Sequence, residues 1–230
     1  MSTTREPTAK PPGANVLVVG RSPSALVTAV DILRKTGYTA NATNQFDRVL
    51  TDYDAGGVDI LVFGGMVPPD IKQHVRDELT RLNPEARVIQ GLFGIPELIA
   101  AQVAAATCPP LPEGDEVAYD ADHRCVRLTI HESADVRVEV WWATSFTPPE
   151  STSASERVYE KTLDPGAYVI PVPHHVPKEA SFGAVTVGQS VRVFTIGPVP
   201  DSVRRMVPTS AEDKRLPDVA AVTTQIDDES

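Results

Sequence analysis

The period of the hydrophobic pattern changes once along this 230-residue chain, and that change constrains the fold more than any other feature. Before residue 108, apolar runs of strand length alternate with stretches whose apolar residues recur at helical spacing. After residue 114, apolar and polar residues mostly alternate one by one, as in half-buried strands. The proline-rich segment 108–114 between them has the composition of a linker. The pattern therefore predicts an α/β domain followed by an all-β domain.

The first domain, residues 14–107, is expected to hold a parallel sheet. Its strand-like runs are each followed by a helical pattern, and this repetition requires right-handed crossovers between parallel strands. The four runs are residues 15–20, 38–43, 58–63 and 87–90. Only about 14 residues separate the second run from the third, which favours the strand order 2-1-3-4. We predict a flavodoxin-like, doubly wound sheet.

The second domain, residues 115–198, contains about seven short strand-like stretches. Turn signals such as Asp164-Pro165-Gly166 lie between them. This spacing predicts a β-sandwich of the immunoglobulin-like type. Trp141 and Trp142 project to opposite faces of one strand. We expect one indole in the sandwich core and the other at the interdomain seam or a binding surface, with packing inside the chain favoured.

The composition of the two ends of the chain and the distribution of charge indicate which kinds of partner the protein can bind. Residues 1–13 and 199–230 are polar or charged, so we expect a disordered start and a disordered acidic tail. The net charge is −10: residues 1–107 carry 10 basic and 11 acidic side chains, whereas residues 108–200 carry 7 and 13. The acidic second half suits a protein partner with a basic surface and argues against nucleic acid. Because no apolar run reaches membrane-span length and no signal pattern opens the chain, we expect a cytoplasmic protein without a membrane partner.

Residues 15–69 resemble a response-regulator receiver domain. The resemblance rests on the opening strand 16–19, the helix end 33–38, and the strand 58–62 followed by Met66-Val67-Pro68. The functional positions differ, because Gly20-Arg21-Ser22 stands where receivers have an acidic pair and Gly64 or Gly65 replaces the phospho-acceptor aspartate. The resemblance thus implies a pseudo-receiver: a non-catalytic regulatory or protein-interaction domain that cannot be phosphorylated in the usual way. Since receivers commonly pair through one face, it also implies a homodimer.

A second resemblance, to dinucleotide-binding folds, competes with the first. Gly20 to Ala25 lies where those folds have their glycine loop, and Val58 to Gly65 is similar to a strand of short-chain dehydrogenases that ends beside the nicotinamide ribose. Only one glycine of the usual three is present. The alternative it implies is a nucleotide- or NAD(P)-binding Rossmann-type protein with oxidoreductase-like chemistry, in which Arg21 or Arg48 meets a phosphate.

Both interpretations direct attention to the carboxyl ends of the parallel strands, where open sheets bind ligands. Ser22-Pro23 begins a helix there, and its free N–H groups would suit an anion. The simpler interpretation is that Ser22 only caps the helix and the glycines only make turns. The candidate ligand-binding residues at this edge are Gly20, Arg21, Ser22, Asn44, Gly64 and Gly65.

Motifs for catalysis or a metal are weak. No serine-hydrolase elbow, zinc-protease motif or phosphate-binding loop occurs, so we predict no catalytic residues. His123, Cys125 and His131 lie close together in the chain, but they form at most a marginal metal site. We therefore predict no bound cofactor, and keep binding of a nucleotide or another small anionic ligand as the alternative.

Overall fold

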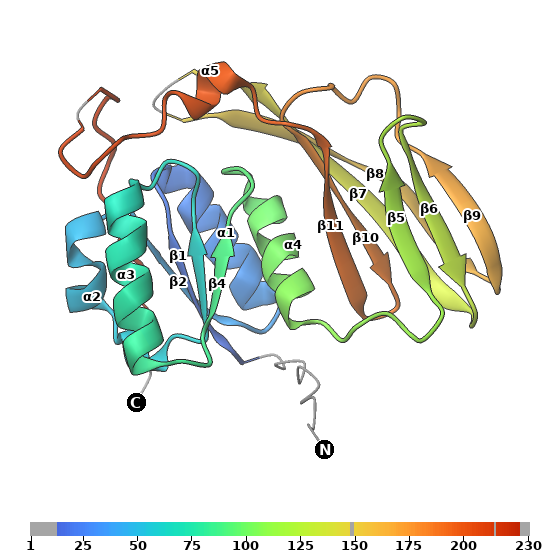
Figure 1. Cartoon of the computed structure of the whole chain (residues 1–230), viewed down its shortest axis with the longest axis horizontal. Coiled ribbons are helices and arrows are strands. Elements are labelled where there is room, and N and C mark those ends of the chain that lie inside the picture. The colour runs from blue at the N-terminus through green and yellow to red at the C-terminus, as the bar shows by residue number, and fades with distance from the viewer. Residues whose placement is uncertain (1–12, 148–149, 214, 226–230) are drawn as a thin grey trace.

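A computed structural model describes residues 13–147, 150–213 and 215–225 of the chain. The predicted disordered residues 1–12, and the last five residues of the tail, lie outside these ranges. Figure 1 shows a layered molecule, in which helices cover both faces of a parallel sheet and two antiparallel sheets follow on the side of α4 (Pro96–Thr107).

The first part of the chain forms a four-stranded parallel sheet in the order β2-β1-β3-β4. Its strands are β1 (Asn15–Val19), β2 (Thr39–Thr43), β3 (Ile60–Phe63) and β4 (Arg87–Gln90). The predicted order is confirmed, and it differs from the order of dinucleotide-binding folds. The two central strands, β1 and β3, are apolar along most of their length because both of their faces are covered by helices.

The helices form two layers around this sheet. On one face, α1 (Pro23–Lys35) and α4 share a core with the sheet through residues such as Leu33 and Val103. On the other face, Val75 of α3 (Pro69–Leu82) and Val49 of α2 (Val49–Asp52) pack beneath Phe63. Two short 3₁₀ turns, η1 (Phe46–Arg48) and η2 (Ala55–Gly57), complete the β2–β3 crossover.

The second part contains antiparallel sheets, as the period-two pattern predicts. Within the described residues, seven strands form one sheet of order β11-β10-β7-β8 and a second of order β5-β6-β9. The two sheets share a core that includes Val126, Val138, Ile170 and Val185. The strands are β5 (Glu116–Asp120), β6 (Cys125–Ile130), β7 (Ala134–Ser145), β8 (Thr152–Leu163), β9 (Gly166–Pro171), β10 (Ser181–Val187) and β11 (Ser190–Gly197).

Helix α4 belongs to both parts of the molecule. Ile99 and Val103 pack into the parallel-sheet core, whereas Leu98, together with Ile95 just before the helix, packs against Trp141 and its neighbours on the antiparallel sheet. A helix with two apolar faces is buried between layers, and Figure 1 shows α4 in that position. The two parts are therefore joined by a shared helix as well as by residues 108–114.

The tryptophan pair packs as expected. Trp141 is 5% exposed in the cluster that faces α4, at the seam between the two parts. Trp142 packs with Val140 and Val172 between the antiparallel sheets. The prediction of intramolecular packing on both faces of this strand is confirmed.

The prediction of a disordered tail is wrong over its described residues. A short helix, α5 (Asp201–Arg204), follows β11, and residues 220–225 then run along the edge strand β2. Thr223 makes an antiparallel bridge with Thr43, and Thr224 N donates to Ala42 O at 2.9 Å. Composition does not predict this order, because a polar segment can form backbone hydrogen bonds with the unpaired groups of an edge strand and needs no apolar side chains to do so.

Candidate ligand-binding site

A cavity of about 460 Å³ lies where the carboxyl edge of the parallel sheet, the β10–β11 face and the tail meet. Its size falls within the usual range for small-molecule sites. The sheet edge contributes Gly20, Gly64 and Gly91, and α5 with the following loop contributes Val203, Met206 and Val207. Three segments that are distant in sequence therefore build one cavity. Figure 1 shows one of them, α5, above the carboxyl ends of the parallel strands.

Apolar side chains make most of the cavity wall. Leu26 of α1 and Ile99 of α4 line it from the parallel-sheet side, and Phe182 lines it from β10. The Phe93 ring lies 6.1 Å from the rings of both Phe146 and Phe182, measured between centroids. Phe93 thus joins the loop after β4 to the antiparallel sheet, and this aromatic group holds the two sides of the cavity together.

The charged residues of the lining all have the same sign. Arg21, at the end of β1, and Arg204, on α5, are the two charged residues among the described residues that line the cavity. The remaining polar lining side chains are neutral: Ser22, Gln90, Ser151 and Thr195. Arg21 also donates a hydrogen bond to the backbone oxygen of Pro217, and this bond ties the tail to the sheet edge.

The first turn of α1 holds a carboxylate from the second part of the chain. Ser22 Oγ donates to Glu150 Oε1 at 2.6 Å, and Ser24 N donates to the same oxygen at 2.9 Å. Ser22 also caps α1 by accepting from Ala25 N at 3.4 Å. Burial raises the pKa of Glu150, but the hydrogen bonds from Ser22 and Ser24 outweigh it and leave the pKa below its ordinary value. An anion position predicted from the sequence is therefore filled from within the chain.

Five of the six candidate residues line the cavity: Gly20, Arg21, Ser22, Gly64 and Gly65. Asn44 lies outside the lining and contacts the tail instead. Its Nδ2 donates to Ala220 O at 2.7 Å, and its Oδ1 accepts from Val222 N at 2.8 Å. The sequence predicts that Asn44, at the end of β2, lies at the ligand-binding edge. In the structure this residue binds the tail and does not line the cavity.

The glycines at the sheet edge are explained by close packing. A Cβ atom on Gly64 would lie 3.1 Å from the Cα of Gly20, and one on Gly91 would lie 2.9 Å from Phe63 O. Gly65, in contrast, has open space around it. Neither Gly64 nor Gly65 has a positive φ, so a left-handed backbone is not the reason for glycine at these two positions. Small residues bring the strand ends together and leave room in front of them.

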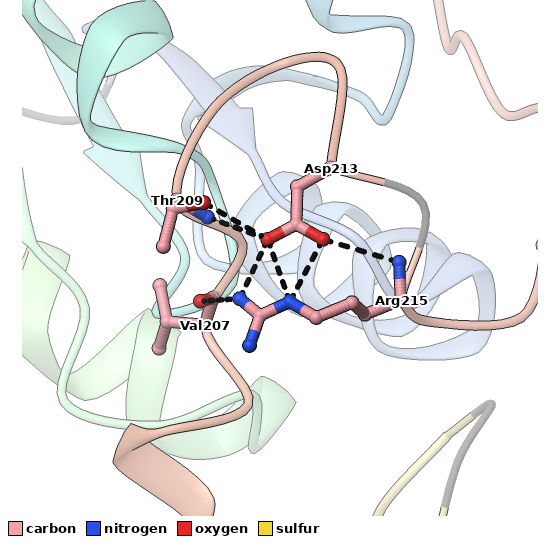
Figure 2. Close-up of polar contacts among 4 residues, drawn as sticks. All are labelled: Val207, Thr209, Asp213 and Arg215. Carbon is pink, nitrogen blue, oxygen red and sulfur yellow. Dashed lines mark hydrogen bonds and ion pairs between the residues drawn. The ribbon is translucent and has the colours of Figure 1, made fainter.

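A network centred on Asp213 shapes the tail where it covers the cavity. Figure 2 shows Asp213 accepting hydrogen bonds from the backbone and side chain of Thr209 and from Arg215. The Arg215 guanidinium also donates to Val207 O at 3.2 Å. The hydrogen bonds from Arg215 and Thr209 hold the pKa of Asp213 well below its ordinary value. This network fixes the loop between two cavity-lining residues, Val207 and Leu216.

The aromatic and tail residues of the site cannot be recognised from local sequence patterns. Phe93, Phe146 and Phe182 come from three separate segments, and each by itself has the pattern of an ordinary core residue. Val203 and Met206 lie in the segment that composition assigns to a disordered tail. The one local signal is the cluster of apolar residues between Val199 and Val207, which is unusual for such a tail.

The weak metal candidates do not converge. His123 Nδ1 lies 2.9 Å from Asp120 Oδ2, His131 Nδ1 lies 3.2 Å from Asp115 Oδ1, and Cys125 is buried. Within residues 13–147, 150–213 and 215–225, no three His, Cys, Asp or Glu side chains are placed to hold one ion. Each helix in these ranges is too short or too polar to cross a bilayer.

No family model matches the sequence, and the curated proteins searched contain no significant relative.

Proposed function

We propose that this protein is a non-catalytic regulatory protein that binds a small, largely apolar molecule in the cavity between its two parts. The observation that carries the proposal is the cavity itself: about 460 Å³, walled by three phenylalanines and by aliphatic side chains from both parts and the tail. Sites for small molecules are typically concave, largely apolar and set at such a junction, with a few polar groups to orient the ligand.

The polar groups at the cavity suit binding better than catalysis. Among the described lining residues, hydroxyl groups occur on Ser22, Ser151 and Thr195, and the lining itself contains no histidine, cysteine, lysine or carboxylate. A carboxylate from outside the lining, Glu150, accepts a hydrogen bond from Ser22 Oγ at 2.6 Å. Ser22 is already engaged as a helix cap and with Glu150. This composition supports a binding role and fits the glycine found where receivers carry their phospho-acceptor.

A ligand in this position would act on both halves of the chain at once. Within the proposal, the flavodoxin-like half is a pseudo-receiver and the other half is an immunoglobulin-like sandwich. The cavity lies between them, so occupancy would favour the arrangement in which Phe93, Phe182 and the tail close around the ligand. Regulation would follow from that shift, through a protein partner on the acidic half or through pairing of two copies.

Nucleotide binding is the competing function, and the first turn of α1 is the observation that favours it. Two observations weigh against it. Ser22 Oγ and Ser24 N already donate to Glu150, so these donors of the turn are not free for a phosphate. The cavity wall is also mainly apolar, whereas a dinucleotide needs polar partners along its phosphates and riboses.

Binding of the neutral apolar dye Nile red to the full chain tests the proposal. We expect saturable fluorescence enhancement with a dissociation constant in the micromolar range, as is common for apolar sites of this size. Gly65→Phe should fill the cavity, because Gly65 lines it and has open space around its Cα. That variant should lose at least about tenfold in affinity, whereas the matched Gly65→Ser variant should keep it.

The same titration separates the two functions. NADH, NADPH and ATP should neither displace the dye nor raise the melting temperature of the protein. Saturable binding of one nucleotide that is lost in Arg21→Ala would replace the proposal with the nucleotide alternative. Absence of saturable dye binding, or equal binding by the Gly65→Phe and Gly65→Ser variants, would refute the cavity as a binding site.

A further inference from the structure

We infer that the ligand of this cavity is an amphipathic acid, with an apolar body inside the cavity and one anionic head group at the rim beside Arg21 and Arg204. This inference rests on the proposed function and specifies its ligand class. The two arginines belong to segments that meet only in the folded chain, since Arg21 follows β1 and Arg204 ends α5.

The charge of the lining carries the inference. Both charged residues that line the cavity are arginines, and no described lining residue is acidic. Over the described part of the chain, neither arginine takes part in an ion pair. A guanidinium group keeps its charge at all accessible pH values and prefers carboxylate partners. A neutral apolar ligand would offer neither arginine an ionic partner, and a cation would be repelled.

The position of Arg21 adds a geometric argument. Its guanidinium reaches across the cavity margin to Pro217 O, so the side chain extends between the sheet edge and the tail. One described hydrogen bond uses one of its five N–H donors. A head group at this margin would therefore contact the sheet edge and the tail together, while the apolar body meets side chains such as Leu26 and Phe182.

Glu150 shows that the same rim accepts a carboxylate. Its oxygen is bound by Ser22, which itself lines the cavity, and by Ser24 N in the first turn of α1. That turn of α1 contains no acidic residue of its own. A negatively charged ligand next to Arg21 would repel Glu150, so the chain's own carboxylate is an internal competitor of the head group.

Calorimetric titration of the full chain with dodecanoate and dodecan-1-ol, both below their aggregation limits, tests the inference. The two probes share one apolar chain and differ in the head group. We expect dodecanoate to bind at least about tenfold more tightly, which is the contribution expected of one charge-assisted hydrogen bond. Arg21→Gln and Arg204→Gln should each reduce dodecanoate affinity several-fold and leave the alcohol unchanged.

Matched variants control for indirect effects. Arg205 neighbours Arg204 and does not line the cavity, so Arg205→Gln should not alter either affinity. Arg204 is exposed, so its substitution keeps the test valid even where Arg21→Gln loosens the tail. Glu150→Gln should raise dodecanoate affinity a few-fold, whereas Glu132→Gln, at an exposed position, should not.

The outcomes separate this inference from the function on which it rests. Equal affinities for the acid and the alcohol, or an acid preference that both arginine variants retain, would overturn the anionic head group and leave the cavity function standing. Binding of Nile red without binding of dodecanoate would overturn it as well. Failure of all three probes to bind would refute the proposed function itself.

Discussion

Asn44 and Val222 hold each other by two reciprocal hydrogen bonds. Asn44 N donates to Val222 O at 3.1 Å, and Asn44 Oδ1 accepts from Val222 N at 2.8 Å. The asparagine side chain thereby continues the backbone ladder of β2 by one more step onto the tail. This pair anchors the segment that returns over the cavity from β11.

Substitution of Asn44 should therefore loosen the tail. Asn44→Ala removes the two side-chain bonds to Ala220 and Val222 in a site that is 8% exposed, so we expect the free energy of unfolding to fall by about 1–3 kcal/mol. Amide exchange at residues 220–225 should accelerate more than elsewhere. The exposed Gln73→Ala on α3 should change stability by less than about 0.5 kcal/mol. Unchanged exchange in the tail would contradict this role of Asn44.

Docking of the tail should also weaken in strong alkali. Tyr53 donates from its hydroxyl to Thr224 O at 2.7 Å and to Ala42 O at 3.0 Å. Burial, followed by the charge of Asp52, raises the pKa of Tyr53 from 10.0 to about 12. Since the folded pKa exceeds the unfolded one, this contribution is complete below pH 10 and is lost as the pH rises through 12.

Ultraviolet difference absorbance of tyrosinate measures this titration. The wild-type chain should show one component near pH 12 that Tyr53→Phe removes. Tyr53→Phe should also flatten the pH dependence of tail exchange over the same range. A Tyr53 component at the ordinary tyrosine pKa would contradict the burial that raises this pKa.

The two glycines after β3 should respond differently to a methyl group. Gly64→Ala would place its Cβ against the backbone of Gly20 at 3.1 Å, so the strands must shift, and we expect destabilisation of about 1–3 kcal/mol. Gly65→Ala meets open space and should stay within about 0.5 kcal/mol of wild type. Urea unfolding of the two variants makes the comparison. Equal destabilisation by both would mean that crowding is not what distinguishes these positions.

Phe93 and Phe182 should be energetically coupled across the cavity. Their rings stack with an interplanar angle of 24° and join the loop after β4 to β10. A double-mutant cycle with Phe93→Leu and Phe182→Leu should give a coupling free energy of about 0.5–1.5 kcal/mol. The pair Phe93 and Phe194 serves as the control, because Phe194 instead stacks on Tyr119. Coupling as small as in the control cycle would show that the stacking of Phe93 on Phe182 does not stabilise the contact between the loop after β4 and β10.

The contact between Glu150 and α1 should break in acid. Its hydrogen bonds place the pKa of Glu150 below the ordinary 4.5, so the contact contributes fully above that pH and is lost as the pH falls through the lowered value. The Ser24 amide, which donates to this carboxylate, should report the titration by its proton chemical shift. Glu150→Gln should abolish the shift change, and a midpoint at or above 4.5 would contradict the contact.

Local patterns in the sequence are enough to predict most of the secondary structure and the topology of the parallel sheet. Short crossovers and apolar strand runs predict the order 2-1-3-4, because both depend on residues that are near neighbours in the chain. The number of antiparallel strands follows in the same way from period-two alternation and turn residues. The sheet edge with Gly20, Arg21, Ser22, Gly64 and Gly65 is also foreseen, since parallel strands all end on one side.

Only the tertiary structure decides the rest of the site. The contact of Phe93 with Phe182, that of Ser22 with Glu150, and the return of the tail to Asn44 join residues more than 80 positions apart. Such pairings cannot be predicted from local patterns. They depend on how α4 packs between the parallel and antiparallel sheets, and on which backbone groups at the sheet edge are left without a strand partner. The sequence by itself determines the two kinds of sheet and the edge that carries the candidate residues, through periodicity and chain connectivity. The tertiary structure determines that this edge is closed into a cavity, because closure depends on packing between distant segments.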